Sequence, residues 1–302
     1  MPNRLLLRLA AQEGVRRLVT ATSLTRPVVE RFVAGETLEE GLAVARELKA
    51  RGIGAILDYL GENVATDEQA DAATAAYLAS LDAIATGRTD AHVSVKLTQL
   101  GLDNSFEGAL GRLRQIGRAA AVGGTRVAID MEAHPYTDRT IEAYRLLRGE
   151  LDVFVLCLQA YLKRTEADAT ALAPLRPSIR LVKGAYDEPD EIAYGRWAMM
   201  ASFRRTLGIL LPASPVTAVA THDELLIKEA IRLARRRLLS PDRFEFQMLY
   251  GVRRDLQVSL VDQGYRVRVY VPFGEQWYPY LMRRLAERPA NLRLFVKAVV
   301  RG

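Results

Sequence analysis

The fold of this chain is decided near its carboxyl end, by the stretch RVRVYVPFGEQWYPYLMRRLAERPAN at residues 266–291. Its first six residues alternate basic with β-branched or aromatic side chains, which predicts a strand, and residues 272–274 should end it. Aromatic, apolar and basic side chains then recur at three- and four-residue spacing from Trp277. This spacing predicts a helix that ends before Pro289.

Two adjacent arginines, Arg283 and Arg284, lie on this predicted helix one turn after Tyr280. Their side chains leave the axis about 100° apart, so both can lean toward one edge of the helix. Two guanidinium groups that converge in this way can bind one carboxylate through charge-assisted hydrogen bonds. A solvated basic face is the alternative interpretation of the pair, and spacing alone favours that alternative.

Length and composition allow one barrel-sized domain. The chain has 302 residues, of which 49% are hydrophobic and 26% charged, as in ordinary soluble proteins. Its formal net charge of +6 suits an anionic substrate, an acidic membrane face or nucleic acid. The single cysteine, Cys157, excludes an internal disulfide and a cysteine-based zinc site, and it indicates a reducing, cytoplasmic compartment. No apolar run is long enough to predict a membrane span.

Eight strand-and-helix units are predicted after an initial helical arm. The arm occupies residues 1–50, contains no predicted strand, and carries a capping box at Thr37 and Glu40. From Gly52 onward, a short β-rich run followed by helical periodicity occurs eight times. The predicted strands begin at Gly54, His92, Arg126, Val153, Ile179, Val216, Phe244 and Arg266.

Eight such units predict a closed (β/α)8 barrel over residues 51–302, with the last helix across the carboxyl ends of the strands. A doubly wound open sheet is the alternative, and it would need a phosphate loop after an early strand. The candidates Gly52-Ile53-Gly54 and Gly123-Gly124 lack the required glycine spacing. We therefore expect the barrel, with its functional residues at the carboxyl ends of the strands.

Charged side chains interrupt the predicted strands where those ends should meet. Lys96 lies in an apolar strand and needs a partner, which Asp130 at the end of the next strand can supply. A purely structural ion pair is the alternative. Two further features follow later strands: Gly184 would let a planar ligand approach the backbone, and His222 precedes a helix whose first amides can receive a pyrophosphate.

The stretch from Tyr270 to Asn291 resembles the carboxyl-terminal signature of the flavin-dependent proline dehydrogenases, and the other strand ends match that family position by position. The resemblance covers roughly residues 50–291, and the helical arm is similar to that of the monofunctional members. It implies FAD-dependent oxidation of L-proline to Δ1-pyrroline-5-carboxylate, with electrons passed to a membrane quinone. A separate pyrroline-5-carboxylate dehydrogenase, contact with the inner face of the cell membrane and no nucleic-acid partner are further expectations.

The resemblance also implies a role for each matched residue. Asp130 and Arg180 are expected at the catalytic centre, and no metal is expected. The implied substrate contacts are Lys96, Leu249, Tyr270, Tyr280, Arg283 and Arg284. The implied flavin contacts are Met131, Gln159, Arg180, Val182, Lys183, Gly184, Ala185, Thr221 and His222. The sequence departs from the family pattern at Asp223, where a neutral Asn can occur, and in a shorter turn before Tyr280.

Other functions remain compatible with the same residues. A lysine at a strand end, Lys96 or Lys183, could form the Schiff base of an aldolase. Asp130, Glu132 and His134 could hold a divalent metal in a lyase or isomerase. A non-enzymatic basic scaffold that binds nucleic acid is the remaining alternative.

Overall fold

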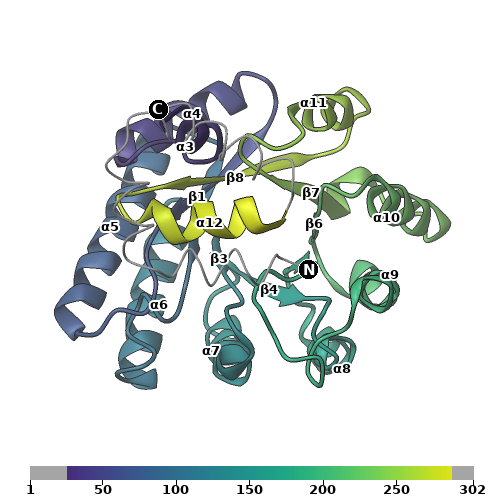
Figure 1. The fold of residues 1–302 in the computed structure, drawn as a ribbon, viewed down its shortest axis with the longest axis horizontal. Coiled ribbons are helices and arrows are strands. Elements are labelled where there is room, and N and C mark those ends of the chain that lie inside the picture. Colours follow the sequence, from purple (N-terminus) through teal and green to yellow (C-terminus); the bar gives the residue numbers. More distant parts are fainter. Residues whose placement is uncertain (1–25, 288–302) are drawn as a thin grey trace.

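The computed structural model describes residues 26–287, which contain a closed barrel of eight parallel strands in chain order (Figure 1). The strands are β1 (Gly54–Tyr59), β2 (Ala91–Val95), β3 (Val127–Ile129), β4 (Phe154–Gln159), β5 (Ile179–Val182), β6 (Thr217–Ala220), β7 (Phe244–Leu249) and β8 (Val267–Phe273). Each overlaps the strand predicted at that place, so the predicted (β/α)8 barrel is confirmed. No helix within the described range is long and apolar enough to cross a bilayer.

Helices surround the barrel; within the described residues, two precede its first strand and the others follow its strands. They are α3 (Arg26–Phe32), α4 (Leu38–Lys49), α5 (Asp67–Thr86), α6 (Phe106–Val122), α7 (Thr137–Arg148), α8 (Thr165–Leu172), α9 (Arg196–Ala213), α10 (Glu224–Arg236), α11 (Arg254–Asp262) and α12 (Trp277–Glu287). Short 3-10 turns lie at His134–Tyr136, Ala173–Leu175 and Pro241–Arg243. Each connection returns the chain to the amino end of the next strand, so all the strands end on the same side.

Most of the hydrophobic core lies between the strands and the helices, because alternate side chains of a strand face opposite ways. In β2, Val93 and Val95 belong to this core. Ser94 and Lys96 instead hydrogen-bond to acidic side chains across the barrel interior. The interior of the barrel is therefore rich in polar and charged groups, unlike the layer outside it.

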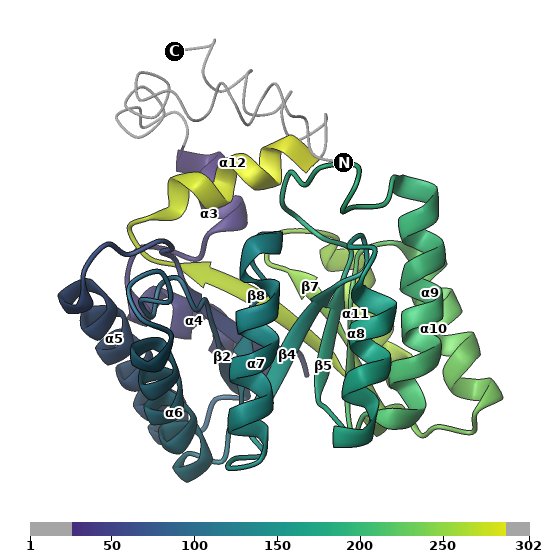
Figure 2. The same cartoon turned by 90° about the horizontal axis from the view of Figure 1, so that it is seen from below.

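Helix α12 lies across the carboxyl ends of the strands, with α3 beside it (Figure 2). The two helices share an apolar cluster that includes Phe32, Val33, Leu281 and Leu285. The predicted position of the last helix over the barrel is thus confirmed. Its described part ends at Glu287, just before Pro289.

The predicted end of the last strand was wrong by two residues, because β8 runs through Pro272 to Phe273. Pairing with β7 stops at Tyr270, whereas pairing with β1 continues to Phe273. Proline is tolerated in a strand at a position where no backbone N–H is needed for a hydrogen bond to the neighbouring strand. The carbonyl of Pro272 also accepts a hydrogen bond from Ala34 N–H at 2.8 Å, which ties the end of the strand to the segment after α3.

The described part of the amino-terminal arm consists of α3 and α4, with residues 33–37 between them not helical. Thr37 and Glu40 form the predicted capping box at the start of α4. Leu42 and Ala45 of α4 belong to the same hydrophobic core as the strands. Residues 1–25 of the arm lie outside the described residues, as does Asn291 of the signature.

Candidate active site

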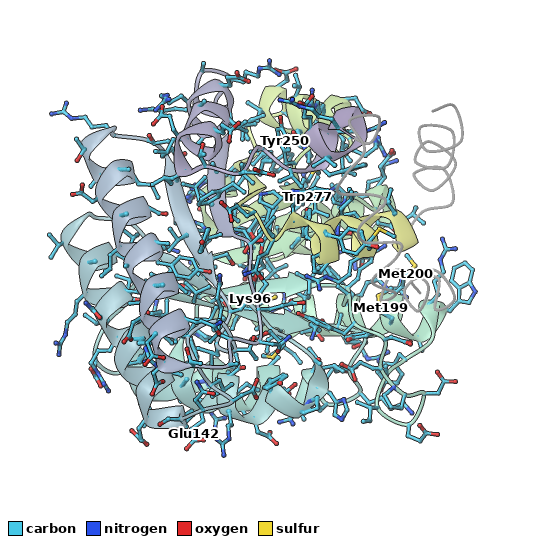
Figure 3. The ribbon with its side chains drawn as sticks, turned by 60° about the vertical axis from the view of Figure 1, so that its left-hand side comes forward. Lys96, Glu142, Met199, Met200, Tyr250 and Trp277 are labelled. Atoms are coloured by element: carbon cyan, nitrogen blue, oxygen red, sulfur yellow. The ribbon has the colours of Figure 1, made fainter. Side chains whose placement is uncertain are left out.

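A cavity of about 620 Å³ opens at the carboxyl ends of the strands. Every residue predicted for the site lines it, and its walls come from the ends of the strands, the following loops and α12. In Figure 3, Lys96 lies near the middle of the ribbon, whereas Glu142 lies at its outer edge. The barrel thus brings together side chains that are far apart in the sequence.

A network of buried charges forms the floor of this cavity. The Nζ of Lys96 lies 2.8 Å from Asp58 Oδ1 and 3.2 Å from Asp130 Oδ2. Arg180 also pairs with Asp130, which accepts hydrogen bonds from the hydroxyls of Tyr270 and Ser94, both at 2.7 Å. The predicted pair of Lys96 and Asp130 is confirmed.

Asp58 was missed by the sequence analysis. It is a charged residue in an otherwise apolar strand, which is the signal that identified Lys96. It lies in β1, where its side chain meets that of Lys96, the residue directly after β2. A search for every charge inside a predicted strand would have found it.

The charges on the cavity floor determine the ionisation states of Asp130 and Lys96. Burial alone would raise the pKa of Asp130, but the charges of Arg180 and Lys96 lower it to about 2. Burial opposes the charge of Lys96 too, yet the negative groups around it, Asp58 first, raise its pKa well above the ordinary value. Lys96 is therefore a protonated ammonium at neutral pH, which is the wrong state for a Schiff-base nucleophile.

Helix α12 places both adjacent arginines against the cavity, so the exposed-face interpretation of this pair is wrong. The Nη1 of Arg283 lies 2.9 Å from Glu62 Oε1, and its guanidinium stacks 5.8 Å from the ring centre of Tyr186. The guanidinium of Arg284 lies 5.4 Å from the ring centre of Tyr280. Both arginines and Tyr280 line the cavity, as the carboxylate-binding hypothesis requires.

Glu62 and Tyr186 are contacts of α12 that the sequence analysis did not identify. Glu62 lies between β1 and α5, and Tyr186 lies between β5 and α9. No periodicity marks either position, because their proximity to Arg283 depends on where α12 rests on the barrel.

The wall formed by β4, β5 and β6 carries the predicted flavin contacts. The amide of Gln159 donates to the Glu132 carbonyl at 2.9 Å and accepts from Ala185 N–H at 3.4 Å. Gly184 has a φ of +123°, and a Cβ built there would lie 2.1 Å from the ring of Tyr161. Glycine at this position is therefore explained by the Tyr161 ring, whereas the sequence analysis had assigned it to a ligand.

Lys183 and the start of α10 complete this wall. The Nζ of Lys183 lies 2.8 Å from Asp223, which also accepts a hydrogen bond from Leu225 N–H as the cap of α10. His222 accepts a hydrogen bond from Leu249 N–H at 2.9 Å. The acidic departure at Asp223 thus has a structural role, since it holds Lys183 at the mouth of the cavity.

The residues of the metal-site alternative have separate partners. Glu132 accepts hydrogen bonds from the amide and hydroxyl of Thr98, whereas His134 pairs with Glu188. Asp130 is occupied by Lys96 and Arg180. Among residues 26–287, no three histidine, cysteine or carboxylate side chains lie close enough together to hold a metal ion.

The protein-family model for proline dehydrogenase matches residues 42–296 of this chain. The chain belongs to the proline dehydrogenase family. It is 39% identical over 278 residues to proline dehydrogenase 1 of Bacillus subtilis subsp. natto, and the match covers 92% of both chains. It is also 39% identical over 281 residues to proline dehydrogenase of Deinococcus radiodurans, with 91% of both chains covered.

A solved structure of a longer protein has the same fold. Proline utilization A from Bdellovibrio bacteriovorus, inactivated by N-propargylglycine, superposes with a TM-score of 0.80 at 25% identity. The match covers 86% of this chain and 32% of that one, so this chain spans about a third of its relative.

Proposed function

We propose that this chain is an FAD-dependent proline dehydrogenase that oxidises L-proline to Δ1-pyrroline-5-carboxylate. The observation that carries the proposal is the convergence of Lys96, Arg283 and Arg284 on one cavity, in a chain that belongs to the proline dehydrogenase family. The protonated state of Lys96 and the separate partners of the metal-site residues favour this reaction over the aldolase and lyase alternatives.

The donor groups on the β4–β6 wall fit FAD. Lys183 and the first amides of α10 suit a pyrophosphate, which would share them with the carboxylate of Asp223. The amide of Gln159 suits the polar edge of a flavin ring. Gln247 lines the same cavity, and its Oε1 is buried without a hydrogen-bond partner among the described residues. FAD, when bound, supplies the acceptor for the hydride that leaves the substrate.

The cationic side chains would bind proline by its carboxylate. Arg283 and Arg284 approach from α12 above the cavity and Lys96 from its floor, so an anion between them contacts positive charge on two sides. Paired contacts of this kind fix the orientation of a small ring as well as its position. Because Arg283 already pairs with Glu62, the substrate must share this guanidinium with a carboxylate of the protein.

Asp130 and Tyr270 would hold this assembly in place. With a pKa of about 2, Asp130 stays ionised at every working pH, and it binds both Lys96 and Arg180. Tyr270 donates to the same carboxylate, and the guanidinium of Arg180 lies 5.5 Å from its ring centre. The ring nitrogen of proline must be neutral when the hydride leaves, so we expect activity to rise with pH until the bound substrate has lost its proton.

We further propose that a membrane quinone accepts the electrons, and that the protein is cytoplasmic and contacts the inner face of the membrane. The net charge of +6 supports attraction to an acidic lipid surface, and the buried free thiol of Cys157 suits a reducing compartment. A separate pyrroline-5-carboxylate dehydrogenase would consume the product.

The visible spectrum of the purified protein tests the proposal. We expect a yellow protein whose flavin absorbance falls when L-proline is added without oxygen and returns when a soluble quinone is added. A preparation that is colourless and cannot be reconstituted with FAD would contradict it. Bleaching without recovery on addition of quinone would leave proline oxidation standing and remove the quinone from the proposal.

A further inference from the structure

A second cavity, of about 80 Å³, lies at the amino ends of the strands, opposite the candidate active site. Its polar lining comes from the beginnings of β2, β3, β7 and β8. Room for one water molecule requires roughly 10–15 Å³ of such space. The cavity can therefore hold several waters or one small ion. Its polar lining residues are His92, Arg126, Glu245, Arg266 and Arg268.

Positive charge exceeds negative charge in this cavity. Glu245 is the one carboxylate among its lining residues, and it lies 3.5 Å from Arg268 and 3.8 Å from Arg266. Arg268 also pairs with Asp90 at 3.0 Å. In the part of the chain that the structure describes, no carboxylate lies within ion-pair distance of Arg126. One guanidinium charge therefore stays uncompensated at the cavity wall.

His92 lines the same cavity and is a buried polar residue. Only 5% of its surface is exposed, and its Nε2 has no hydrogen-bond partner among the described residues. Burial lowers the pKa of His92 well below its ordinary value, and the nearby guanidinium charges, that of Arg268 first, lower it further. A neutral imidazole can still donate one N–H. Buried polar atoms without partners are rare, and a bound water or ion commonly explains them.

We propose that this cavity binds one small inorganic anion, of phosphate size or smaller, between Arg126, Arg266 and the Nε2–H of His92. Water alone would satisfy the imidazole but would not neutralise the excess positive charge of the lining, which includes Arg266 with a side chain that is 48% exposed to solvent. An anion would accept a hydrogen bond from the imidazole and would also neutralise the excess positive charge. The site is independent of proline oxidation, because the layer of Ser94 and Arg180 separates it from the substrate cavity.

The three histidines of the chain make the site measurable. His134 and His222 lie toward the carboxyl ends of the strands and serve as internal references in a histidine-labelled NMR spectrum. The protein is first saturated with FAD, so that added phosphate does not fill the start of α10. It is then titrated at constant ionic strength with sodium phosphate, with sodium chloride, or with gluconate, which is too large for the cavity.

We expect the His92 signal to shift and saturate with phosphate or chloride, while gluconate has no effect and the other two histidines do not move. The salt that saturates at the lower concentration identifies the preferred anion. If neither salt moves His92, the cavity holds water only and the proposal fails. A shift of all three histidines would also contradict it, because that is a general effect of salt.

A matched pair of arginine variants separates the site from general charge effects. Arg126→Ala should weaken anion binding by at least about tenfold, because a charge-assisted contact is lost. Arg145→Ala removes an exposed arginine from α7 and should bind like the wild type. Equal affinities for both variants would overturn the assignment of Arg126. Should Arg126→Ala fail to fold, the wild-type titration decides the proposal by itself.

Discussion

The floor of the candidate active site and the helix above it carry charge in different ways. On the floor, Lys96 and Arg180 are almost fully buried and share the carboxylate of Asp130, with Asp58 as a second partner of the lysine. On α12, Arg283 pairs with Glu62 within the described part of the chain, and both side chains are about one-fifth exposed. We therefore expect loss of a floor partner to lower stability, and loss of an α12 arginine to affect binding more than stability.

The largest effect should come from removing the shared carboxylate of the floor. Asp130→Asn leaves Lys96 and Arg180 with less negative charge, and breaking one partner of a buried pair costs about 3–5 kcal/mol. Denaturant unfolding measures this loss. The control is Asp138→Asn, whose partner is Arg164 and whose side chain is 80% exposed, and we expect it to change stability by about 0.5 kcal/mol or less. Equal losses in the two variants would remove the contrast between floor and surface.

A substitution on α12 should affect binding more than stability. We expect Arg284→Ala to raise the KM for proline by an amount equivalent to about 2–4 kcal/mol, because a carboxylate loses a buried cationic partner. Steady-state kinetics and a thermal melt, measured on the same preparation, separate the two effects. Arg284→Lys should recover part of the affinity. An unchanged KM in Arg284→Ala would exclude this residue from the carboxylate site.

Two carboxyl groups at the end of β3 should give stability opposite dependences on pH. Burial raises the pKa of Glu132 from 4.5 to about 7, so its contribution is present below pH 4.5 and is lost as pH rises to 7. Asp130, with a pKa of about 2, contributes stability above pH 4 that is lost as pH falls toward 2. Glu132→Gln should remove the first dependence and gain up to about 3 kcal/mol at pH 7. The prediction is contradicted if the free energy of unfolding changes with pH between 4.5 and 7 in the same way in wild type and variant.

The smallest change in stability should follow from removing the partner of Arg283. This ion pair lies at the cavity wall and both side chains reach solvent, so Glu62→Gln should cost about 1 kcal/mol or less. Denaturant unfolding beside Asp130→Asn gives the comparison. A loss as large as that of Asp130→Asn would show that α12 is held to the barrel mainly by this ion pair.

The barrel and its floor could be predicted because both depend on patterns that are local in sequence. Eight apolar strand runs specify the closed sheet, and a lysine inside one of them must find a carboxylate on a neighbouring strand. Asp58 could have been found in the same way, because it too is a charged residue inside an apolar strand. No sequence pattern marks Glu62, because its contact with Arg283 joins segments more than 200 residues apart and depends on the packing of α12. The strand end at Pro272 was missed because only the register of β1 and β8 shows that no ladder bond is lost there.

The cluster that joins α3 to α12 has a consequence for synthesis of the protein. Phe32 and Val33 are translated long before Leu281 and Leu285, with which they share an apolar cluster. The barrel strands can pair before α12 has been synthesised, but Arg283 and Arg284 cannot yet be held over the cavity. A nascent chain would thus form the wall of β4, β5 and β6 before α12 is packed over the cavity. Removal of the residues through α3 should loosen α12 and leave the sheet intact.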